Sequence, residues 1–405
     1  MEIQIPSYAL SLKPKLETLL LLAQQQGFTI AQLTVLTSKE SIFLINNPQQ
    51  ITIATDLYND AMVDISEQPL NFILNYQQVN YGYWADCVIH LAINEQEQRV
   101  DSWQHNNASE DDIDDQLLNV TELSLLDQEW HFVWFLLLIS LGFPVQDALV
   151  ICRAALMVSR ETWPTDFTDL PQFASTAKKF NSFESVPAFP KLHYPLGFYP
   201  VVDDVKWLEK LLPLGIKTIQ LRIKQATSPQ LEQQIQQAVC LAEQYKAQLF
   251  INDHWQLAIK YGAFGVHLGQ EDLLSADLVA LAQAKIRLGV STHGFYELIK
   301  LQTLQVSYLA FGHIFPTTTK IMPSKPQGLA RLACYQSYAK QLGIESVAIG
   351  GIDLTNAHDV LATGVNSIAV VRAITQAPDT AYVVRQFQQM LILNSAKEIK
   401  KEVDL

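Results

Sequence analysis

Charged and amide side chains follow a short apolar run in the second half of the chain. Gln220, Arg222 and Lys224 alternate there with apolar residues, so a strand would place all three on one face. Two cations that point into a protein interior need a negative partner. That partner is either a bound anion or an acidic neighbour in an ordinary salt bridge, and this segment alone favours neither.

Carboxylates stand at the ends of the next two apolar runs. Asp253 lies in Asn252-Asp253-His254, and Asp272 follows it by 19 residues, just past the next run. Mg²⁺ prefers one or two carboxylates together with substrate phosphate oxygens. Beside the cations, the two carboxylates therefore predict a magnesium site, with acid–base catalysis as the alternative use of the pair.

Hydroxyl groups gather further along the chain. Ser291 ends another apolar run, where its hydroxyl serves either a substrate or the cap of the following helix. The stretch Thr317-Thr318-Thr319-Lys320 combines three hydroxyls with an ammonium group, which suits a phosphate. The lone histidines near these runs are expected to be packed, hydrogen-bonded structural residues rather than catalytic bases: His267, His293 and His313.

Glycines and a basic residue end the last two runs. Gly350-Gly351 follows one of them, and Val371-Arg372 follows the other. Glycine lets a phosphate approach backbone N–H groups closely. Phosphate sites in parallel barrels recur in the loops after strands seven and eight, where helix N-termini favour anions.

The elements that must position these residues form a regular series. Eight Val/Ile/Leu-rich runs alternate with amphipathic stretches, of which 231–245 and 329–341 show a clear helical period. Eight such units in about 200 residues predict a closed (β/α)8 barrel. An open doubly wound sheet more often has fewer strands and a GxGxxG motif after the first, and no such motif follows here. The predicted strands are 198–202, 218–222, 248–252, 265–268, 286–290, 308–312, 346–350 and 367–371.

The chain is long enough for two domains, since it has 405 residues. A stretch with two prolines and no sustained period separates the halves. We predict a smaller α/β accessory domain over 1–175, a linker over 176–194, the barrel over 195–395 and a tail over 396–405. Apolar alternation in the first half is visible only at 31–37, 41–45 and 88–92.

Charge is spread unevenly between the halves. Residues 1–190 carry 8 Lys and Arg against 24 Asp and Glu, and residues 191–405 carry 20 against 17. The acidic first half argues against nucleic acid or an anionic membrane as its partner. Its acidic run 110–115 is expected to be a solvated loop rather than a metal site. The apolar run 132–144 is shorter than the roughly 20 residues of a membrane span and predicts a buried core helix.

Cysteine spacing and the N-terminal residues bear on the compartment. The four cysteines stand far apart with no CxxC pair, which indicates neither a disulfide framework nor a zinc site. The first residues lack the basic start and apolar middle of a signal peptide. We expect a cytoplasmic protein with reduced thiols.

The second half, over 196–377, resembles thiamine phosphate synthase. The motifs GFYPVVDD, IQLRIK, LFINDHWQLA, GVHLGQEDL, LGVSTH, AFGHIFPTTTK, VAIGGI and IAVV occur in the order of that family. The resemblance implies a magnesium-dependent transferase of thiamine biosynthesis, which joins a pyrimidine diphosphate to a thiazole phosphate and releases diphosphate. It also implies that these two small phosphorylated molecules are its partners. A homo-oligomer is compatible with the sequence.

The resemblance also implies roles for matching residues. The metal would lie between Asp253 and Asp272. The pyrimidine diphosphate would contact Gln220, Leu221, Arg222, Ile223, Lys224, Asn252, Ser291 and Lys320. The thiazole phosphate would contact Thr317, Thr318, Thr319, Gly351, Val371 and Arg372. Arg372 departs from the small residue, usually serine, that the family has at this position.

Two other functions stay open at this point. One is a barrel that binds the same phosphates without catalysis. The other is a related enzyme that isomerises a thiazole phosphate, which would have little use for QLRIK and the paired aspartates. Product analysis separates the isomerising enzyme from the synthase.

The first half bears a weaker resemblance to another family. Residues 135–142 and 144–159 look like the last helical pair of pyrimidine-phosphate kinases of the ribokinase-like class. The Gly-Thr-Gly anion hole of those kinases is absent, and Glu129-Trp130-His131 stands nearby instead. We expect a degenerate remnant without kinase activity.

Overall fold

The computed structural model describes residues 2–30, 34–38, 42–58, 69–77, 85–95, 98–105, 117–173, 183, 185–224, 229–317 and 325–403. The chain divides into two compact units, Met1–Ser182 and Phe183–Leu405. The division falls inside the segment 176–194. Each unit has its own sheet and its own core.

The first unit is built on a mixed sheet. Its nine strands lie in the order β2-β1-β3-β4-β5-β6-β7-β8-β9. Strands β1–β2, β4–β5 and β5–β6 pair in parallel, and the other neighbours pair antiparallel. The strands are β1 (Glu2–Pro6), β2 (Thr34–Ser38), β3 (Phe43–Asn47), β4 (Gln49–Thr55), β5 (Leu70–Asn75), β6 (Ala85–Glu95), β7 (Gln98–His105), β8 (Leu117–Asn119) and β9 (Gln172–Phe173).

Among the described residues, three α-helices accompany this sheet: α1 (Leu12–Gln25), α2 (Leu125–Ser140) and α3 (Val145–Met157). Ser124 is the N-cap of helix α2, and its side chain accepts a hydrogen bond from the Asp127 N–H. Every residue of α2 from His131 to its end is buried. The Phe132 ring packs on Phe43 of β3, with ring centroids 4.7 Å apart. The predicted core helix is therefore confirmed, and none of the described helices is long and apolar enough to cross a membrane.

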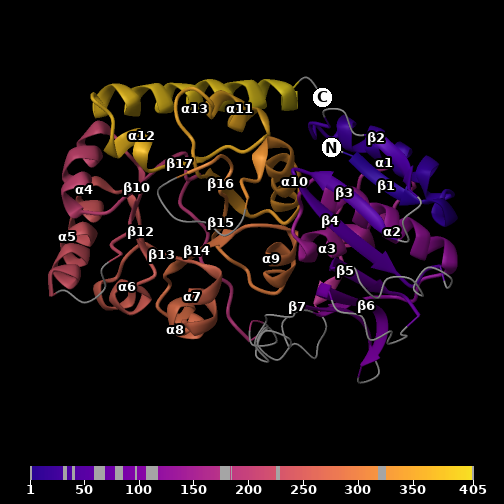
Figure 1. The fold of residues 1–405 in the computed structure, drawn as a ribbon. Helices are drawn as coiled ribbons and strands as arrows, with labels where there is room; N and C mark the ends of the chain where they lie inside the picture. Colours follow the sequence, from indigo (N-terminus) through magenta and orange to yellow (C-terminus); the bar gives the residue numbers. More distant parts are fainter. Residues whose placement is uncertain are drawn as a thin grey trace. The chain divides into compact units, whose positions relative to one another are not determined.

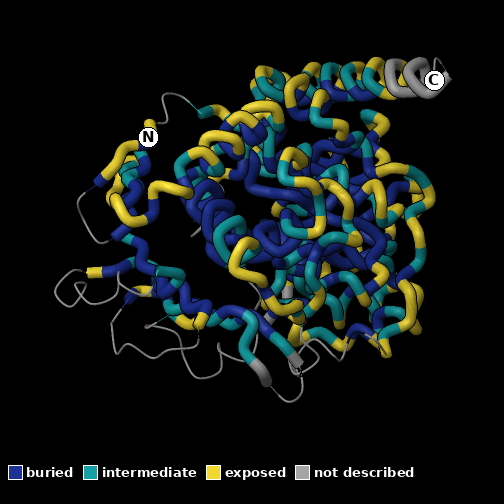
Figure 2. The backbone as a smooth tube through the Cα atoms, turned by 90° about the vertical axis from the view of Figure 1, so that its right-hand side faces the viewer, coloured by how far each residue is buried: buried dark blue, intermediate teal, exposed yellow. Residues whose placement is uncertain are grey.

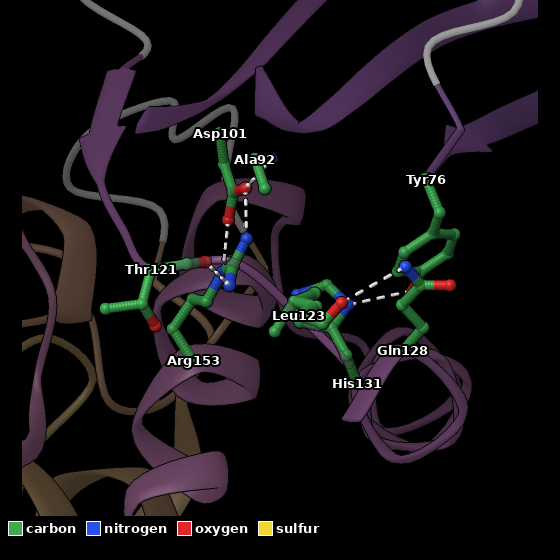
Figure 3. A network of polar contacts seen from close by, with 8 residues as sticks. All are labelled: Tyr76, Ala92, Asp101, Thr121, Leu123, Gln128, His131 and Arg153. Carbon is green, nitrogen blue, oxygen red and sulfur yellow. Dashed lines mark hydrogen bonds and ion pairs between the residues drawn. The ribbon is translucent and has the colours of Figure 1, made fainter. Parts of the chain in front are cut away.

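A buried ion pair joins α3 to the sheet (Figure 3). Arg153 of α3 donates from Nε and Nη2 to the carboxylate of Asp101 on β7, at 2.6 and 2.5 Å. Two hydrogen bonds with the backbone add to this pair. Arg153 also donates to the Thr121 carbonyl, and Asp101 accepts from the Ala92 N–H. Both charged side chains are almost fully buried. The acidic run 110–115 lies outside the described residues.

The second unit is a closed parallel barrel of eight strands, as predicted (Figure 1). The observed ends differ from the predicted ones by one or two residues at several strands. The strands are β10 (Phe198–Val202), β11 (Thr218–Leu221), β12 (Gln248–Asn252), β13 (Gly265–Leu268), β14 (Arg287–Thr292), β15 (Tyr308–Phe311), β16 (Glu345–Ile349) and β17 (Ile368–Val370).

Helices follow the barrel strands along the chain. They are α4 (Val205–Leu211), α5 (Pro229–Tyr245), α6 (Trp255–Tyr261), α7 (Gln270–Ser275), α8 (Leu278–Gln283), α9 (Phe295–Lys300), α10 (Gly328–Gln341), α11 (Ala357–Ala362), α12 (Arg372–Thr375) and α13 (Thr380–Val403). Figure 1 shows α13 running beside α11 and α12, with which it is in contact. Because α13 ends at Val403, most of the expected tail 396–405 is helical.

Large side chains fill the barrel interior. Tyr199, Phe250 and Tyr308 pack against one another and against smaller aliphatic residues of the other strands. Gly289 of β14 makes room for one of these rings, because a Cβ atom there would lie 2.1 Å from the Tyr308 ring. In Figure 2 the buried residues run through the interior of each unit and the exposed ones lie outside. A packed barrel interior leaves chemistry to the strand ends.

Part of the expected linker belongs to the barrel. The Ser307 hydroxyl donates to the carbonyl of Pro190 at 2.7 Å, and Arg287 Nε donates to the carbonyl of Lys191 at 2.9 Å. Phe189 is buried. Since Arg287 begins β14 and Ser307 precedes β15, this segment lies across the N-terminal ends of the strands. The sequence showed only the absence of a regular period there, which does not reveal such contacts.

Candidate active site

A cavity of about 580 Å³ opens at the C-terminal ends of the barrel strands. Parallel strands bring their C-terminal ends to one rim, so residues far apart in the sequence meet there. Ten of the predicted site residues line this cavity: Gln220, Arg222, Asn252, Asp253, Asp272, Ser291, Thr317, Gly351, Val371 and Arg372.

The remaining predicted residues lie elsewhere. Strand β11 ends at Leu221, so the strand alternation from which Lys224 was expected to point inward with Gln220 does not extend to it. Ile223 and Lys224 line an adjoining cavity of about 440 Å³, which also has Arg222 in its wall. Leu221 is buried and lines neither cavity. Thr318, Thr319 and Lys320 lie outside the described residues.

The cation and amides of β11 and β12 face the same space. Gln220 and Asn252 are buried in the wall, and Arg222 is partly exposed. The Arg222 N–H continues the pairing of β11 by donating to the Val202 carbonyl at 2.7 Å. Within the described part of the chain, the Arg222 guanidinium makes no salt bridge. For Arg222, an ordinary structural ion pair with a described residue therefore loses its support.

The carboxyls of Asp253 and Asp272 are hydrogen-bonded to each other. Burial, the negative charge of Asp272 and this hydrogen bond raise the pKa of Asp253 to about 6, and the charge of Arg222 opposes them. Asp253 follows β12 with a positive φ of 62°, which is uncommon for a residue other than glycine. The Asp253 N–H donates to the carbonyl of His267 at 3.0 Å. Two acidic groups in contact, one with a raised pKa, require a shared proton or a cation between them.

This donor set fits a magnesium ion. Over the described ranges, no three His, Cys, Asp or Glu side chains come together as a metal site. The two carboxylates would leave most coordination positions to water and to substrate phosphate oxygens, which is the arrangement that Mg²⁺ favours. The same arrangement is poorly suited to zinc, which takes three or four protein ligands.

Glycines let two loops pack at the opposite side of the cavity. A Cβ atom on Gly350 would lie 2.4 Å from Cβ of His313, and one on Gly351 would lie 2.7 Å from the carbonyl oxygen of Pro316. Both glycines also have positive φ angles, 103° and 68°. They therefore hold the loop after β16 against the loop that carries Thr317. Thr317 and Gly351 both line the cavity.

Ser291 faces the cavity rather than capping a helix. The N-cap of α9 is Gly294, and no side chain caps this helix. Instead, the Ser291 hydroxyl is 2.9 Å from Nε2 of His267. Burial, together with the charges of Arg222 and His293, lowers the pKa of His267 to about 3, so this imidazole is neutral.

Several lining residues escaped the prediction: Tyr199, His293, His313, Asp353 and Gln376. Tyr199 could have been found, because it alternates with Val201 on β10. Nδ1 of His293 is hydrogen-bonded to Oε2 of Glu297 at 3.0 Å, as expected of a packed histidine. His267 is bonded at both ring nitrogens, also as expected. No pattern in the sequence identified Gln376 or Asp353, which lie beyond the strand ends.

A smaller cavity lies among the described residues of the first unit. A cavity of about 100 Å³ is lined by Tyr76, Leu91, Ala92, Arg99, Glu122, Leu123 and Gln128. Small-molecule sites usually have about 300–1,000 Å³. Near it, His131 lies in α2 with Nδ1 2.9 Å from the Tyr76 hydroxyl, and Glu129 binds Lys15 at 2.5 Å. Both His131 and Glu129 thus have partners within the first unit.

Comparisons with known proteins concern the barrel. Residues 198–374 match the family described as thiamine monophosphate synthase. A thiamine-phosphate synthase of Yersinia pestis (strain Pestoides F) is 53% identical over 218 residues, which are 54% of this chain and 99% of the relative. That of Pectobacterium atrosepticum is 53% identical over 212 residues, 52% of this chain and 92% of the relative.

Among solved structures, a thiamine phosphate pyrophosphorylase from Pyrococcus furiosus is 29% identical. The match covers 49% of this chain and 96% of the Pyrococcus furiosus chain, with a TM-score of 0.44. This chain spans almost the whole length of the two thiamine-phosphate synthases, and its 53% identity to them decides the family. Through its barrel, the chain belongs to the thiamine monophosphate synthase family.

Proposed function

We propose that the barrel is a magnesium-dependent thiamine phosphate synthase that joins 4-amino-2-methyl-5-hydroxymethylpyrimidine diphosphate to a thiazole phosphate. The observation that carries the proposal is the convergence of a cation, two paired carboxylates, hydroxyls and a glycine pair on one cavity. Relatives named thiamine-phosphate synthase that are 53% identical support it. The paired aspartates have no evident use in a thiazole-isomerising enzyme.

In the proposed reaction, the thiazole nitrogen bonds to the methylene carbon of the pyrimidine. The bond from that carbon to the diphosphate oxygen breaks, and diphosphate leaves with the electron pair. The aminopyrimidine ring shares the positive charge that develops on the methylene, so the protein need not supply a covalent nucleophile. Orientation of two bound substrates is then a large part of catalysis.

Charged residues of this chain would bind the departing diphosphate. Arg222 stands in the cavity wall without a described salt-bridge partner, so it can pair with the diphosphate as charge accumulates there. Lys224 lines the adjoining cavity, and Lys320 has the role that the family resemblance implies. Asp253 and Asp272 would hold Mg²⁺, which when bound neutralises charge on the diphosphate.

The other residues bind and orient. Gln220 and Asn252 are buried amides that can recognise the aminopyrimidine, and Ser291 presents a hydroxyl toward the diphosphate. On the opposite wall, Thr317 and Gly351 would hold the thiazole phosphate. The aliphatic floor of the cavity includes Ala310, Val347 and Ala369, and such a floor limits water near a developing carbocation.

Arg372 also belongs to the proposed phosphate end. It begins α12 directly after the last strand and lines the cavity beside Val371. The family's small residue can offer only a hydroxyl or a backbone N–H here. An arginine adds a guanidinium, which recognises phosphate well, so the departure is compatible with the proposed function.

The test is an assay of the purified full chain with Mg²⁺ and both substrates. We expect formation of thiamine phosphate and an equal amount of diphosphate. Asp253→Asn should lower kcat/KM at least about tenfold, equivalent to about 1.4 kcal/mol of transition-state stabilisation. Asp359→Asn is the control, since Asp359 is an exposed aspartate on α11 and should leave kcat/KM unchanged. No product from folded wild-type protein would overturn the proposal.

A further inference from the structure

A chain of five polar side chains crosses the barrel beneath the cavity. Gln220 Nε2 donates to the Tyr199 hydroxyl at 3.1 Å, and that hydroxyl is 2.9 Å from the hydroxyl of Tyr308. The Tyr308 hydroxyl is 2.8 Å from Nδ1 of His267, and His267 Nε2 is 2.9 Å from the hydroxyl of Ser291. Four of these residues line the cavity, and they are linked through Tyr308, which does not line it itself.

The middle of this chain is held rigidly. Tyr308 is fully buried, and its ring stacks on the imidazole of His267 with an interplanar angle of 21°. Phe250 packs against the same ring at 5.0 Å, and Gly289 leaves the space that the ring occupies. The linked residues come from β10, β11, β13, β14 and β15. Such close packing keeps each polar atom beside the same partners, so it determines which atoms can form hydrogen bonds with each other.

The chain has a direction because each hydroxyl donates only one hydrogen. The amide nitrogen of Gln220 can only donate, so the Tyr199 hydroxyl accepts from it and donates to Tyr308. Tyr308 then donates to Nδ1 of His267. A neutral imidazole that accepts at Nδ1 carries its hydrogen on Nε2, and this N–H donates to Ser291.

This direction determines whether each end of the hydrogen-bonded chain offers a donor or an acceptor to a ligand. The Gln220 amide oxygen remains as an acceptor, and the Ser291 hydroxyl keeps its own hydrogen to donate. In the opposite direction, Gln220 would offer a donor and Ser291 only lone pairs. The two ends therefore switch together, and a ligand that reaches both must match one of the two patterns.

We propose that Tyr308 is a positioning residue that sets this direction, so that the cavity offers an acceptor at Gln220 together with a donor at Ser291. This pattern fits a ligand with an N–H donor on its ring and an anionic phosphate on its arm. For the identity of that ligand the inference rests on the proposed function, since an aminopyrimidine diphosphate has both groups. The direction of the chain is a property of the protein without any ligand.

The direction can be measured on the ligand-free full chain by ¹⁵N NMR of histidine side chains. The two neutral tautomers have distinct ring-nitrogen shifts, and loss of a signal in His267→Gln assigns it. We expect His267 to carry its hydrogen on Nε2. In Tyr308→Phe nothing donates to Nδ1, and the Nδ1–H form should become populated. A wild-type protein with the hydrogen on Nδ1 would overturn the proposal, whether or not the enzyme assay succeeds.

Kinetics supply a second readout. Tyr308→Phe should raise KM for the pyrimidine diphosphate about five- to tenfold, as expected when a buried hydrogen bond is lost, and change KM for the thiazole phosphate less than about twofold. Tyr335→Phe is the matched control, because Tyr335 is equally buried and packs on Phe311 of β15. It should change neither KM. An equal rise of both KM values in Tyr308→Phe would indicate general damage and contradict the proposal.

A further variant covers failure of Tyr308→Phe to fold. Tyr199→Phe breaks the link to Gln220 but leaves the contact of Tyr308 with His267. It should raise KM for the pyrimidine diphosphate by a similar factor, because the Gln220 amide loses the hydroxyl that accepts its hydrogen bond. An unchanged KM in this variant would contradict the role of the hydrogen-bonded chain in orienting Gln220.

Discussion

His131 shows how a single buried residue makes stability depend on pH. It lies fully buried in α2, and burial, together with the nearby charge of Arg153, lowers its pKa well below 6.5. The folded protein therefore keeps the imidazole neutral, whereas the unfolded chain binds a proton below about pH 6.5. Because the unfolded state binds more protons there, stability is full above that pH and falls as the solution becomes more acidic.

Replacing His131 should remove this dependence. Between pH 7.5 and 5.5, the wild type should lose about 1.4 kcal/mol more unfolding free energy than His131→Gln, as follows from one group that titrates only in the unfolded state. Urea unfolding of the first unit at both pH values measures the difference. His358→Gln is the control, since His358 is exposed, and it should follow the wild type. Equal pH slopes for His131→Gln and wild type would contradict the assignment.

The site residues found from the sequence share one property: they stand where a predicted strand ends. Asp253 and Asp272 could be placed together because parallel strands end at one rim. Tyr308 could not be assigned a role in this way, because its importance comes from contacts with residues on other strands. For Lys224 this reasoning has no basis, because alternation was extended past Leu221, where β11 ends.

At the scale of elements, the segment before the barrel closes its N-terminal end. Gln248 at the start of β12 accepts from the His193 N–H at 2.9 Å and donates to the Tyr194 carbonyl at 3.2 Å. These bonds add to those of Pro190 and Lys191 with the neighbouring strands. Contacts at the bottom of such barrels usually concern stability rather than catalysis. A barrel fragment should therefore start at residue 183 rather than 195.

The buried aromatic residue of this segment provides the test. Phe189→Ala should lower the unfolding free energy of the barrel by about 3 kcal/mol, the usual scale for a buried phenylalanine. Lys191→Ala should change it by less than about 0.5 kcal/mol, since the Lys191 side chain is exposed and only its carbonyl binds Arg287. Urea unfolding followed by fluorescence measures both. A similar small change in both variants would mean that the segment does not support the barrel.

The two sheets differed in how far the sequence predicted them. The barrel strands were found because buried parallel strands are continuous apolar runs bounded by helices of clear period. In the first unit, only three runs of alternation matched observed strands, and the order of the nine strands was not predicted. A mixed sheet depends on pairings between distant segments, such as β8 with β9, and these leave no local pattern.

At the scale of the whole molecule, charge follows the division into units. Residues 1–182 have 8 Lys and Arg against 23 Asp and Glu, and residues 183–405 have 20 against 18. Every residue that lines the proposed catalytic cavity belongs to the second unit. The strongly acidic charge is thus absent from the unit that would bind anionic substrates, where it would repel them.

Breaking the buried ion pair of the first unit tests whether catalysis depends on that unit. Arg153→Met would leave the Asp101 carboxylate buried without its cation, with an expected loss of about 3–5 kcal/mol in the unfolding free energy of the first unit. Arg160→Met is the control, because the Arg160–Asp127 pair is about one third exposed and such pairs contribute about 0–1 kcal/mol. The rate of diphosphate release at a temperature where the barrel remains folded should stay within about twofold of wild type in both variants. A rate that falls together with the stability of the first unit would show that the barrel depends on it for catalysis.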